Sequence, residues 1–208
     1  MEEPFEGKEI GGVLHRPDTP NQDAIALTHG AGSNHTAPVL VKMAQALAAA
    51  GYLVLRYDLP FRRLRAKGSP NPSGAARDRQ GVATAIAALR ERVAGRVSAG
   101  GHSYGGRQTA MAAAEHAGLA DSLLLFSYPL HPPGRPEQKR TAYFPDLRTP
   151  ALFVHGTSDP FGTPEELREA IALIPAHTDL LLVERCGHDL KGAPAVSAEI
   201  VQRFRALA

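Results

Sequence analysis

The chain has 208 residues, of which 43% are hydrophobic and 21% charged, a composition that predicts one globular domain over residues 1–208. A formal net charge of +2 favours no nucleic-acid partner. The acidic start MEEPFEGKEI lacks a signal-peptide pattern, and no apolar run is long enough to cross a bilayer. The single cysteine, Cys186, excludes an intrachain disulfide. We therefore expect a cytoplasmic protein that does not bind membranes; its oligomeric state cannot be read from these features.

The first part of the chain alternates short apolar runs with helical patterns. Residues 24–28 (AIALT) predict a buried strand, and the stretch HGAGS follows it. Residues 38–50 repeat apolar side chains at helical spacing and end at Gly51. Residues 52–57 (YLVLRY) predict a second strand, which leads into a loop rich in proline, glycine and arginine through Ser73.

The middle of the chain repeats this alternation. Residues 78–93 and 107–116 have helical periodicity, whereas residues 96–100 and 122–126 predict short strands. Many prolines in residues 129–150 predict a long surface loop.

The last part of the chain adds strands over residues 151–155 and 180–183 and an amphipathic helix over residues 195–207. Another helix begins at Thr163-Pro164-Glu165-Glu166, which combines a capping box with proline at the first helical position. Continuous apolar strands that alternate with helices predict a three-layer α/β sandwich, with a mostly parallel central sheet and helices on both faces. Residues 127–150 are too few for a lid domain.

The stretch GGHSYGG contains Ser103 within the pattern G-x-S-x-G. This pattern is short and occurs by chance, so its surroundings matter. A predicted strand precedes it and a predicted helix follows it, as a nucleophile elbow requires. Gly101 and Gly105 leave room for the flanking chains to pass close together. We therefore interpret Ser103 as a nucleophile.

A serine hydroxyl needs a base to take its proton and an acid to orient that base. Asp159 directly follows the strand ALFVH, and His188 follows the strand LLLV. Parallel strands end at the same edge of a sheet, so both residues are expected near Ser103. Asp189 is an alternative acid and His155 an alternative base, and both rank below the first pair.

The loop HGAGS and the residue after Ser103 are expected to supply oxyanion donors. The backbone N–H groups of Tyr104 and Ala31 are the first candidates, with Gly32 as the alternative to Ala31. HGAGS could also be a phosphate-binding loop, but no G-K-[ST] follows it. The histidines form no H-x-x-x-H pattern, and one cysteine makes no zinc motif, so we expect no metal and no cofactor.

An arginine-rich cluster lies in the loop after the strand YLVLRY. It is either a solvated loop face or a rim that attracts an anionic substrate. Loops at the expected active edge also supply side chains that are as easily packing residues as substrate contacts. The cluster comprises Arg62, Arg63, Arg65 and Lys67; the candidate contacts are Asn34, Pro60, Phe61, Arg62, Tyr128, Pro129 and Phe161.

Several segments together resemble the α/β-hydrolase superfamily: LTHGAGSNHTAP, GGHSYGGRQTAMAAA, YPLHPPGRPEQKRT, LFVHGTSDPFGTPEEL and CGHDLKG. They are most similar to its small, lidless, dienelactone-hydrolase-like branch, in particular to predicted bacterial α/β hydrolases whose eukaryotic relatives include scaffold-like subunits of chromatin complexes. The resemblance implies a triad of Ser103, Asp159 and His188. True dienelactone hydrolases have cysteine as the nucleophile, so lactone specificity is not implied for a chain with serine there.

These features predict a serine hydrolase that cleaves a small carboxylic ester or related acyl compound through an acyl-enzyme. The alternatives are a non-catalytic interaction protein on the same fold, and a thioesterase or peptidase that uses the same chemistry.

Overall fold

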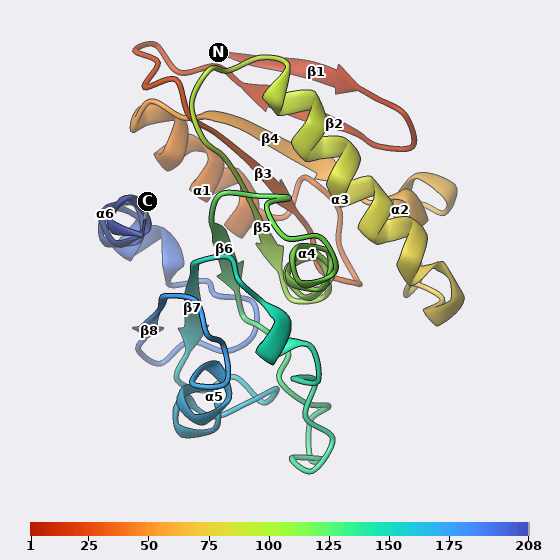
Figure 1. Ribbon diagram of the computed structural model, residues 1–208, viewed down its shortest axis with the longest axis vertical. Coiled ribbons are helices and arrows are strands. Elements are labelled where there is room, and N and C mark those ends of the chain that lie inside the picture. The colour runs from red at the N-terminus through yellow and green to blue at the C-terminus, as the bar shows by residue number, and fades with distance from the viewer. Residues whose placement is uncertain (208) are drawn as a thin grey trace.

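The computed structural model describes residues 1–207 and contains one mixed sheet of eight strands in the order β1-β2-β4-β3-β5-β6-β7-β8. Strands β4, β3, β5, β6, β7 and β8 run parallel, while β1 and β2 form an antiparallel pair at the edge beside β4. Figure 1 shows the sheet in the middle of the molecule. The strands are β1 (Glu2–Glu6), β2 (Gly11–His15), β3 (Ala24–Thr28), β4 (Leu53–Asp58), β5 (Val97–His102), β6 (Leu123–Phe126), β7 (Ala151–Gly156) and β8 (Thr178–Val183).

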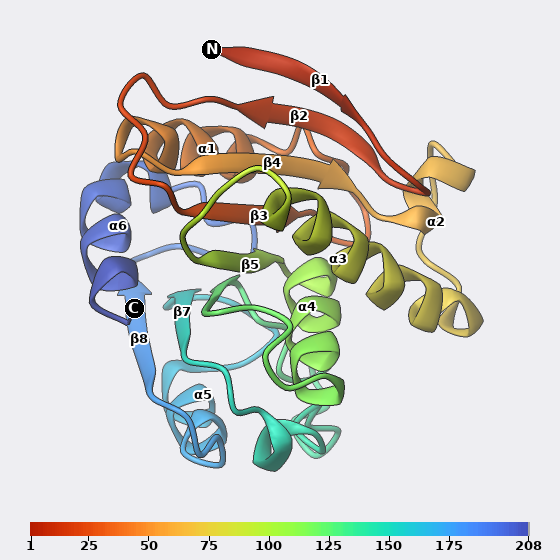
Figure 2. The same cartoon turned by 45° about the horizontal axis from the view of Figure 1, so that its top comes forward.

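Helices cover both faces of this sheet (Figure 2). One buried cluster joins the sheet to α3, α4 and α5, and a second joins the opposite face to α1 and α6. The α helices are α1 (Pro38–Ala49), α2 (Pro60–Leu64), α3 (Ala75–Arg90), α4 (Tyr104–Glu115), α5 (Pro164–Ile171) and α6 (Ser197–Ala206). The predicted three-layer α/β architecture with a mostly parallel sheet is therefore confirmed.

The start of α5 has the predicted capping box. The Glu166 N–H donates to Thr163 Oγ1, and the Glu166 carboxylate accepts the Thr163 N–H at 2.8 Å. Strands β1 and β2 and helix α2 were not predicted. Strands β1 and β2 alternate exposed and buried residues too weakly to be recognised, and α2 is a short helix inside the arginine-rich loop.

The segment 127–150, which includes the predicted surface loop of residues 129–150, contributes to the core. Tyr128, Leu130, Phe144 and Leu147 are buried in the same cluster as α4, and the 3-10 helix η2 (Phe144–Asp146) lies within this segment. Its prolines prevent regular structure but not packing, because a proline-rich chain can still direct large apolar side chains into a core. Within residues 1–207, no separate lid domain covers the edge of the sheet at which β3, β5, β7 and β8 end.

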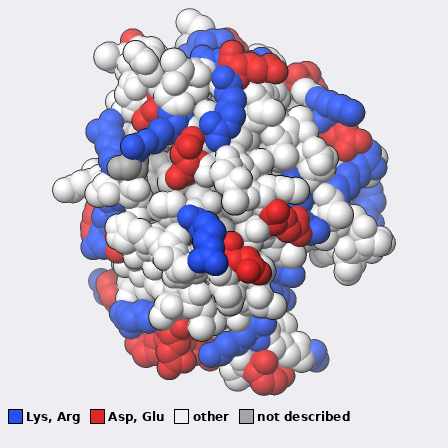
Figure 3. All heavy atoms as spheres, viewed as in Figure 1, with Lys and Arg blue, Asp and Glu red and all other residues white. Residues whose placement is uncertain are grey.

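Acidic and basic side chains are interspersed on the face of the molecule shown in Figure 3. Among residues 1–207, no helix is both long and apolar enough to span a lipid bilayer. The parallel strands β3, β5, β7 and β8 all end at one edge of the sheet, and the loops that follow them carry the residues described next.

Candidate active site

Ser103 stands in a strained turn between β5 and α4. Its backbone angles are φ 52° and ψ −117°, in a region that residues other than glycine rarely adopt. A Cβ at Gly101 would lie 2.5 Å from the Thr28 carbonyl oxygen, and a Cβ at Gly105 would lie 2.5 Å from the His29 carbonyl oxygen. Glycine at both positions therefore lets the strand, the turn and the helix pass close to β3, as expected for a nucleophile elbow.

The structure brings Ser103, His188 and Asp159 into one hydrogen-bonded chain. His188 Nδ1 lies 2.8 Å from Asp159 Oδ2 and 3.0 Å from Asp159 Oδ1. An ionised carboxylate can only accept, so Nδ1–H is the donor and Nε2 is free to accept. Ser103 Oγ lies 2.7 Å from His188 Nε2 and donates its proton to it. This is the arrangement in which a serine hydroxyl can be deprotonated.

The Asp159 side chain is fully buried, whereas 22% of the His188 side chain is exposed. Burial raises the pKa of Asp159, but the hydrogen bond and charge of His188, with the Phe161 N–H, lower it more, so the net pKa lies below the ordinary value. The carboxylate is therefore ionised at neutral pH and can stabilise a positive charge on the imidazole.

The alternative acid and base face elsewhere. Asp189 is exposed and pairs with Lys191, whose Nζ lies 2.9 Å from its Oδ2. His155 is fully buried, and its Nε2–H donates to the Gly162 carbonyl oxygen at 2.8 Å. Neither contacts Ser103, so the geometry favours the first-ranked pair.

The backbone of the 29–33 loop is held tightly beside the serine turn. His29 is fully buried; its Nδ1–H donates to the Gly30 carbonyl at 2.9 Å, and its Nε2 accepts the Leu59 N–H at 3.2 Å. Within residues 1–207, the N–H groups of Ala31 and Tyr104 donate to no other protein group, whereas the Ser33 N–H bonds the Gly30 carbonyl at 3.1 Å. These free donors are what an oxyanion site requires.

The Arg62 side chain is buried and bonded to the backbone, which argues against the predicted role of a substrate contact. Its side chain is buried, with 6% exposed, and donates to four backbone carbonyls. Nη2 bonds the Ala31 oxygen at 2.8 Å and the Gly68 oxygen at 3.1 Å, while Nε bonds the Ser33 oxygen at 2.8 Å and Nη1 bonds the Arg65 oxygen at 3.2 Å. Its donors are thus used to hold the 29–33 loop, because a buried guanidinium must be satisfied.

The other members of the arginine-rich cluster are turned to solvent. Arg63 pairs with Glu6 at 2.7 Å, Arg65 donates to the Ser69 carbonyl at 2.7 Å, and Lys67 is exposed. Arg62 is therefore buried and bonded to the backbone, whereas Arg63, Arg65 and Lys67 face solvent. The four side chains do not line one binding site together.

Tyr128 is also corrected as a substrate contact, because only 1% of it is exposed and its hydroxyl donates to the Arg140 carbonyl at 2.6 Å. Phe61 is nearly buried and packs against Tyr104, with ring centroids 5.6 Å apart. Asn34 is half-buried, and its side-chain oxygen caps the Thr36 N–H at 2.8 Å.

Phe161 lies directly against the site. Its ring stacks on the His188 imidazole, with centroids 4.1 Å apart and planes inclined by 29°. It is partly exposed, so a ligand at Ser103 can reach it. Of the predicted contacts, Phe161 is the one that borders the triad itself.

Two positioning residues escaped the sequence analysis. His102 Nε2–H donates to the His188 carbonyl at 2.6 Å, and burial lowers the pKa of this histidine, which keeps it neutral. Asp78, 1% exposed, accepts from the Phe61 N–H at 3.0 Å and from the Tyr104 hydroxyl at 2.7 Å. The signal for His102 was its place beside Ser103, and the signal for Asp78 was a carboxylate on the apolar side of a helix.

An apolar pocket of about 360 Å³ opens beside His102. Its walls come from Ser33, from the start of α1 with Val39, and from Leu190 and Pro194 after His188. Among residues 1–207, no group of three His, Cys, Asp or Glu side chains is placed to hold a metal ion.

Comparisons with known proteins agree with this architecture. Residues 21–204 match the family model described as "Alpha/beta hydrolase domain". The chain is similar in structure to a dienelactone hydrolase from Anabaena variabilis ATCC 29413, with 19% identity, a TM-score of 0.75, and 99% of this chain and 97% of that chain covered.

Two further solved structures are comparable. An α/β serine hydrolase without a lid from Xanthomonas campestris has 18% identity and a TM-score of 0.73, with 98% of this chain and 94% of that chain covered. The esterase domain of a Rhodothermus marinus protein has 16% identity and a TM-score of 0.72, with 100% and 99% covered. At these identities the likeness concerns the fold.

Proposed function

Because the chain belongs to the α/β-hydrolase family, we propose that it is a serine hydrolase that cleaves a small carboxylic ester or a related acyl compound. The observation that carries this proposal is the chain of hydrogen bonds from Ser103 through His188 to the buried Asp159, built on a strained serine turn. Esterase and dienelactone hydrolase neighbours with the same fold support a hydrolase in general.

In the proposed reaction, Ser103 Oγ attacks the ester carbonyl carbon while His188 Nε2 takes its proton. Asp159 holds the imidazole and stabilises the cation that forms. The negative charge on the former carbonyl oxygen is bound by the N–H groups of Ala31 and Tyr104. His188 then gives its proton to the leaving alcohol, which leaves an acyl group on Ser103.

A water molecule completes the proposed cycle. His188 removes a proton from this water as the water oxygen attacks the acyl carbon. The bond between the acyl carbon and Ser103 Oγ then breaks, His188 returns the proton to Ser103 Oγ, and the acid product leaves. The exposed part of the His188 side chain is where such a water can arrive. Asn34, Phe61 and Phe161 are proposed as substrate contacts, with Phe161 flanking the imidazole.

The apolar pocket beside His102 is the proposed place for the hydrocarbon part of the substrate. Its lining by Val39, Leu190 and Pro194 favours burial of apolar surface. Esters whose acyl part carries an alkyl chain longer than a methyl group, or an aryl group, are therefore expected to react faster than acetate esters.

A fluorophosphonate probe, which reacts covalently with activated serines, tests the proposal. We expect labelling of the wild-type chain and no labelling of Ser103→Ala. A panel of p-nitrophenyl esters, thioesters and aminoacyl amides then ranks the leaving groups. A folded wild-type chain that neither reacts with the probe nor cleaves any panel member would contradict the proposal and favour a non-catalytic role for the fold.

A further inference from the structure

His155, near the carboxyl end of β7, has a ring nitrogen that the proposed reaction does not use. Its Nε2 lies 2.8 Å from the Gly162 carbonyl oxygen, and because a carbonyl only accepts, Nε2 carries a proton. Its Nδ1 is shielded from solvent and has no hydrogen-bond partner among residues 1–207. Asp159 Oδ2 lies 3.9 Å from this Nδ1, and both side chains are fully buried. An unsatisfied nitrogen therefore lies close to the buried carboxylate of the triad.

The Asp159 carboxylate holds a negative charge that its hydrogen-bond donors do not neutralise. Its Oδ1 accepts the Phe161 N–H at 2.9 Å, and both of its oxygens lie within 3.0 Å of His188 Nδ1. The His188 imidazole is neutral in the resting site, because its Nε2 accepts the Ser103 hydroxyl proton. The carboxylate thus has donors but no cation, and a buried charge without a counter-charge is costly.

Two protonation states of His155 Nδ1 can be compared. Without a proton, the Nδ1 lone pair lies beside a negative oxygen in a dry environment, and neither atom gains a bond. With a proton, the imidazolium supplies the positive charge that Asp159 lacks. Burial penalises an imidazolium, but it also strengthens the attraction to the carboxylate, which is buried in either state. The charged pair therefore removes two costs at once, the unsatisfied nitrogen and the uncompensated carboxylate.

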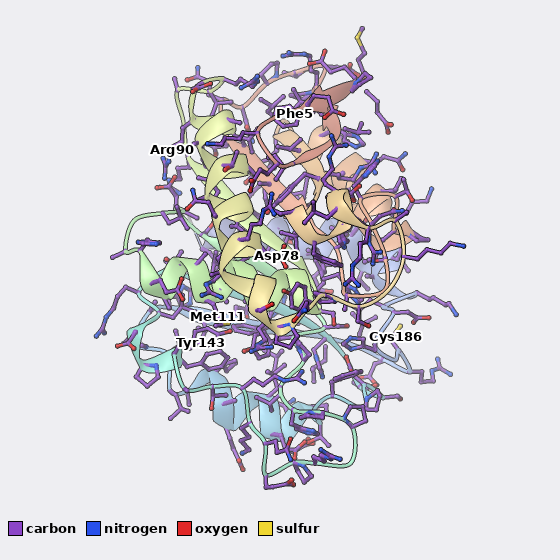
Figure 4. The ribbon with its side chains drawn as sticks, turned by 90° about the vertical axis from the view of Figure 1, so that its right-hand side faces the viewer. Phe5, Asp78, Arg90, Met111, Tyr143 and Cys186 are labelled. Atoms are coloured by element: carbon purple, nitrogen blue, oxygen red, sulfur yellow. The ribbon has the colours of Figure 1, made fainter. Side chains whose placement is uncertain are left out.

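The loops after β7 and β8 hold this carboxylate between the two histidines. The loop after β8 contains Cys186, which is labelled in Figure 4, and ends at His188. The Ser158 N–H donates to the Cys186 carbonyl oxygen at 2.8 Å, which fixes this loop against the loop after β7. His155 and Asp159 thus approach from the β7 side, and His188 from the β8 side.

Other charged groups do not compete for His155. Among residues 1–207, Asp159 is its one ion-pair partner within 4 Å. The residues beside His155 on the flanking strands, Ser127 after β6 and Leu182 of β8, carry no charge. The charged or titratable groups of the adjoining loops are His131, which pairs with Glu166 at 3.2 Å, His188, and the exposed Glu184, Arg185 and Asp189.

We propose that His155 is a positioning residue of the triad, which carries a proton on both ring nitrogens at neutral pH and forms a buried ion pair with Asp159. One carboxylate is then shared by two imidazoles. This inference rests on the proposed hydrolase function and adds a fourth member to its site. The positive charge on His155 opposes protonation of His188, so His188 stays neutral and able to act as a base at lower pH.

Nuclear magnetic resonance of the wild-type chain tests the protonation state without catalysis. Two-bond ¹H–¹⁵N correlation spectra at pH 7 distinguish a ring nitrogen that carries a proton from one that does not. The His155 signals are those missing from the spectrum of His155→Gln; if that variant does not fold, they are assigned through bonds from the His155 backbone. We expect both ring nitrogens of His155 to carry protons. An Nδ1 without a proton at pH 7 overturns the proposal.

The pH profile of kcat/KM for p-nitrophenyl butyrate tests the effect on His188. His155→Gln keeps a donor for the Gly162 carbonyl but cannot hold a charge. The midpoint of the acid limb should rise by about 0.5 to 1 pH unit in this variant, because Asp159 then attracts a proton to His188 more strongly. A role in packing alone would lower kcat/KM at every pH and leave the midpoint in place.

His131→Gln is the matched control, because His131 is a buried histidine of the adjoining segment that pairs with Glu166 instead. Its midpoint should be that of wild type. A midpoint that is unchanged or lower in His155→Gln, or an equal rise in His131→Gln, overturns the proposal.

The spectra separate this inference from the hydrolase proposal. If both His155 nitrogens carry protons but the fluorophosphonate probe does not label the wild type, the ion pair stands and the hydrolase proposal falls. If Nδ1 carries no proton and labelling of Ser103 is normal, the hydrolase proposal stands and the inference about His155 falls.

Discussion

Arg62 Nη2 donates to the Ala31 carbonyl oxygen at 2.8 Å, from a helix that lies thirty-one residues further along the chain. The same guanidinium bonds Ser33 on the other side of the loop turn. The loop that is proposed to bind the oxyanion is therefore braced from behind by a buried cation. This relationship makes Arg62 a positioning residue.

Replacing Arg62 should consequently reduce turnover more than substrate binding. In Arg62→Met the Ala31 and Ser33 carbonyls lose their donor and the loop relaxes, so kcat should fall by roughly tenfold to a hundredfold, less than the loss of an oxyanion donor itself. KM for a small neutral ester should change little. Steady-state kinetics check this, with Arg65→Met as the control, because Arg65 is exposed and bonds only the Ser69 carbonyl. A rise in KM with unchanged kcat would instead indicate a substrate contact.

The acid of the triad can be identified by a pair of amide substitutions. Asp159→Asn removes the charge that orients His188, and should lower kcat by about 10⁴-fold with little effect on folding. Asp189→Asn should leave kcat close to wild type, because Asp189 is exposed and pairs with Lys191. The reverse result would show that Asp189 orients His188 in solution.

The pH dependence of the free energy of unfolding should reflect the burial of His29. Burial lowers the pKa of His29 from 6.5 to about 4, so the folded state holds it neutral where the unfolded chain binds a proton. The unfolded state binds more protons between pH 6.5 and about 4. Unfolding free energy therefore falls as pH drops through this window, by up to about 3 kcal/mol from this group.

His29→Gln, which cannot titrate, isolates that contribution. Urea unfolding at a series of pH values should give a flatter pH dependence for the variant than for wild type, whatever the absolute stability of the variant. Parallel curves would show that His29 does not titrate differently in the two states.

The backbone strain at Ser103 should be measurable as a difference in the free energy of unfolding between two variants at this position. At φ 52° and ψ −117° a Cβ is unfavourable, and glycine is not. Ser103→Gly should therefore be more stable than Ser103→Ala by about 1 kcal/mol, after allowance for the greater freedom of glycine in the unfolded chain. Chemical denaturation of the two inactive variants checks this, and a less stable Ser103→Gly would mean that the turn is not strained.

Much of the fold follows from local patterns. Apolar runs such as residues 24–28 and the capping box at Thr163 are short-range signals, and the structure has a strand and a helix there. Strands β1 and β2 were missed, because an antiparallel edge pair with one solvated face lacks a continuous apolar run. The order of Ser103, Asp159 and His188 could be read because each follows a predicted strand and parallel strands end at one edge.

The surroundings of that edge could not be read in the same way. The spacing of arginines in the sequence does not predict which side chain is buried. In the structure Arg62 is buried, whereas Arg63 is exposed to solvent. That choice depends on carbonyls of the 29–33 loop, which are distant in sequence. Tyr128 was considered as a substrate contact or a packing residue, and it is buried because segment 127–150 packs on α4.

The sequence by itself determined the alternation of strands and helices, the glycine-flanked turn at Ser103 and the chain order of its partners, because these depend on residue spacing and backbone preference. Only the tertiary structure decided which charges are satisfied internally. The Arg62 guanidinium bonds the backbone of the 29–33 loop, whereas Arg107 Nε has no hydrogen-bond partner among residues 1–207. The physical reason is that burial and pairing of a charged side chain are set by groups from distant segments, which the fold alone brings together.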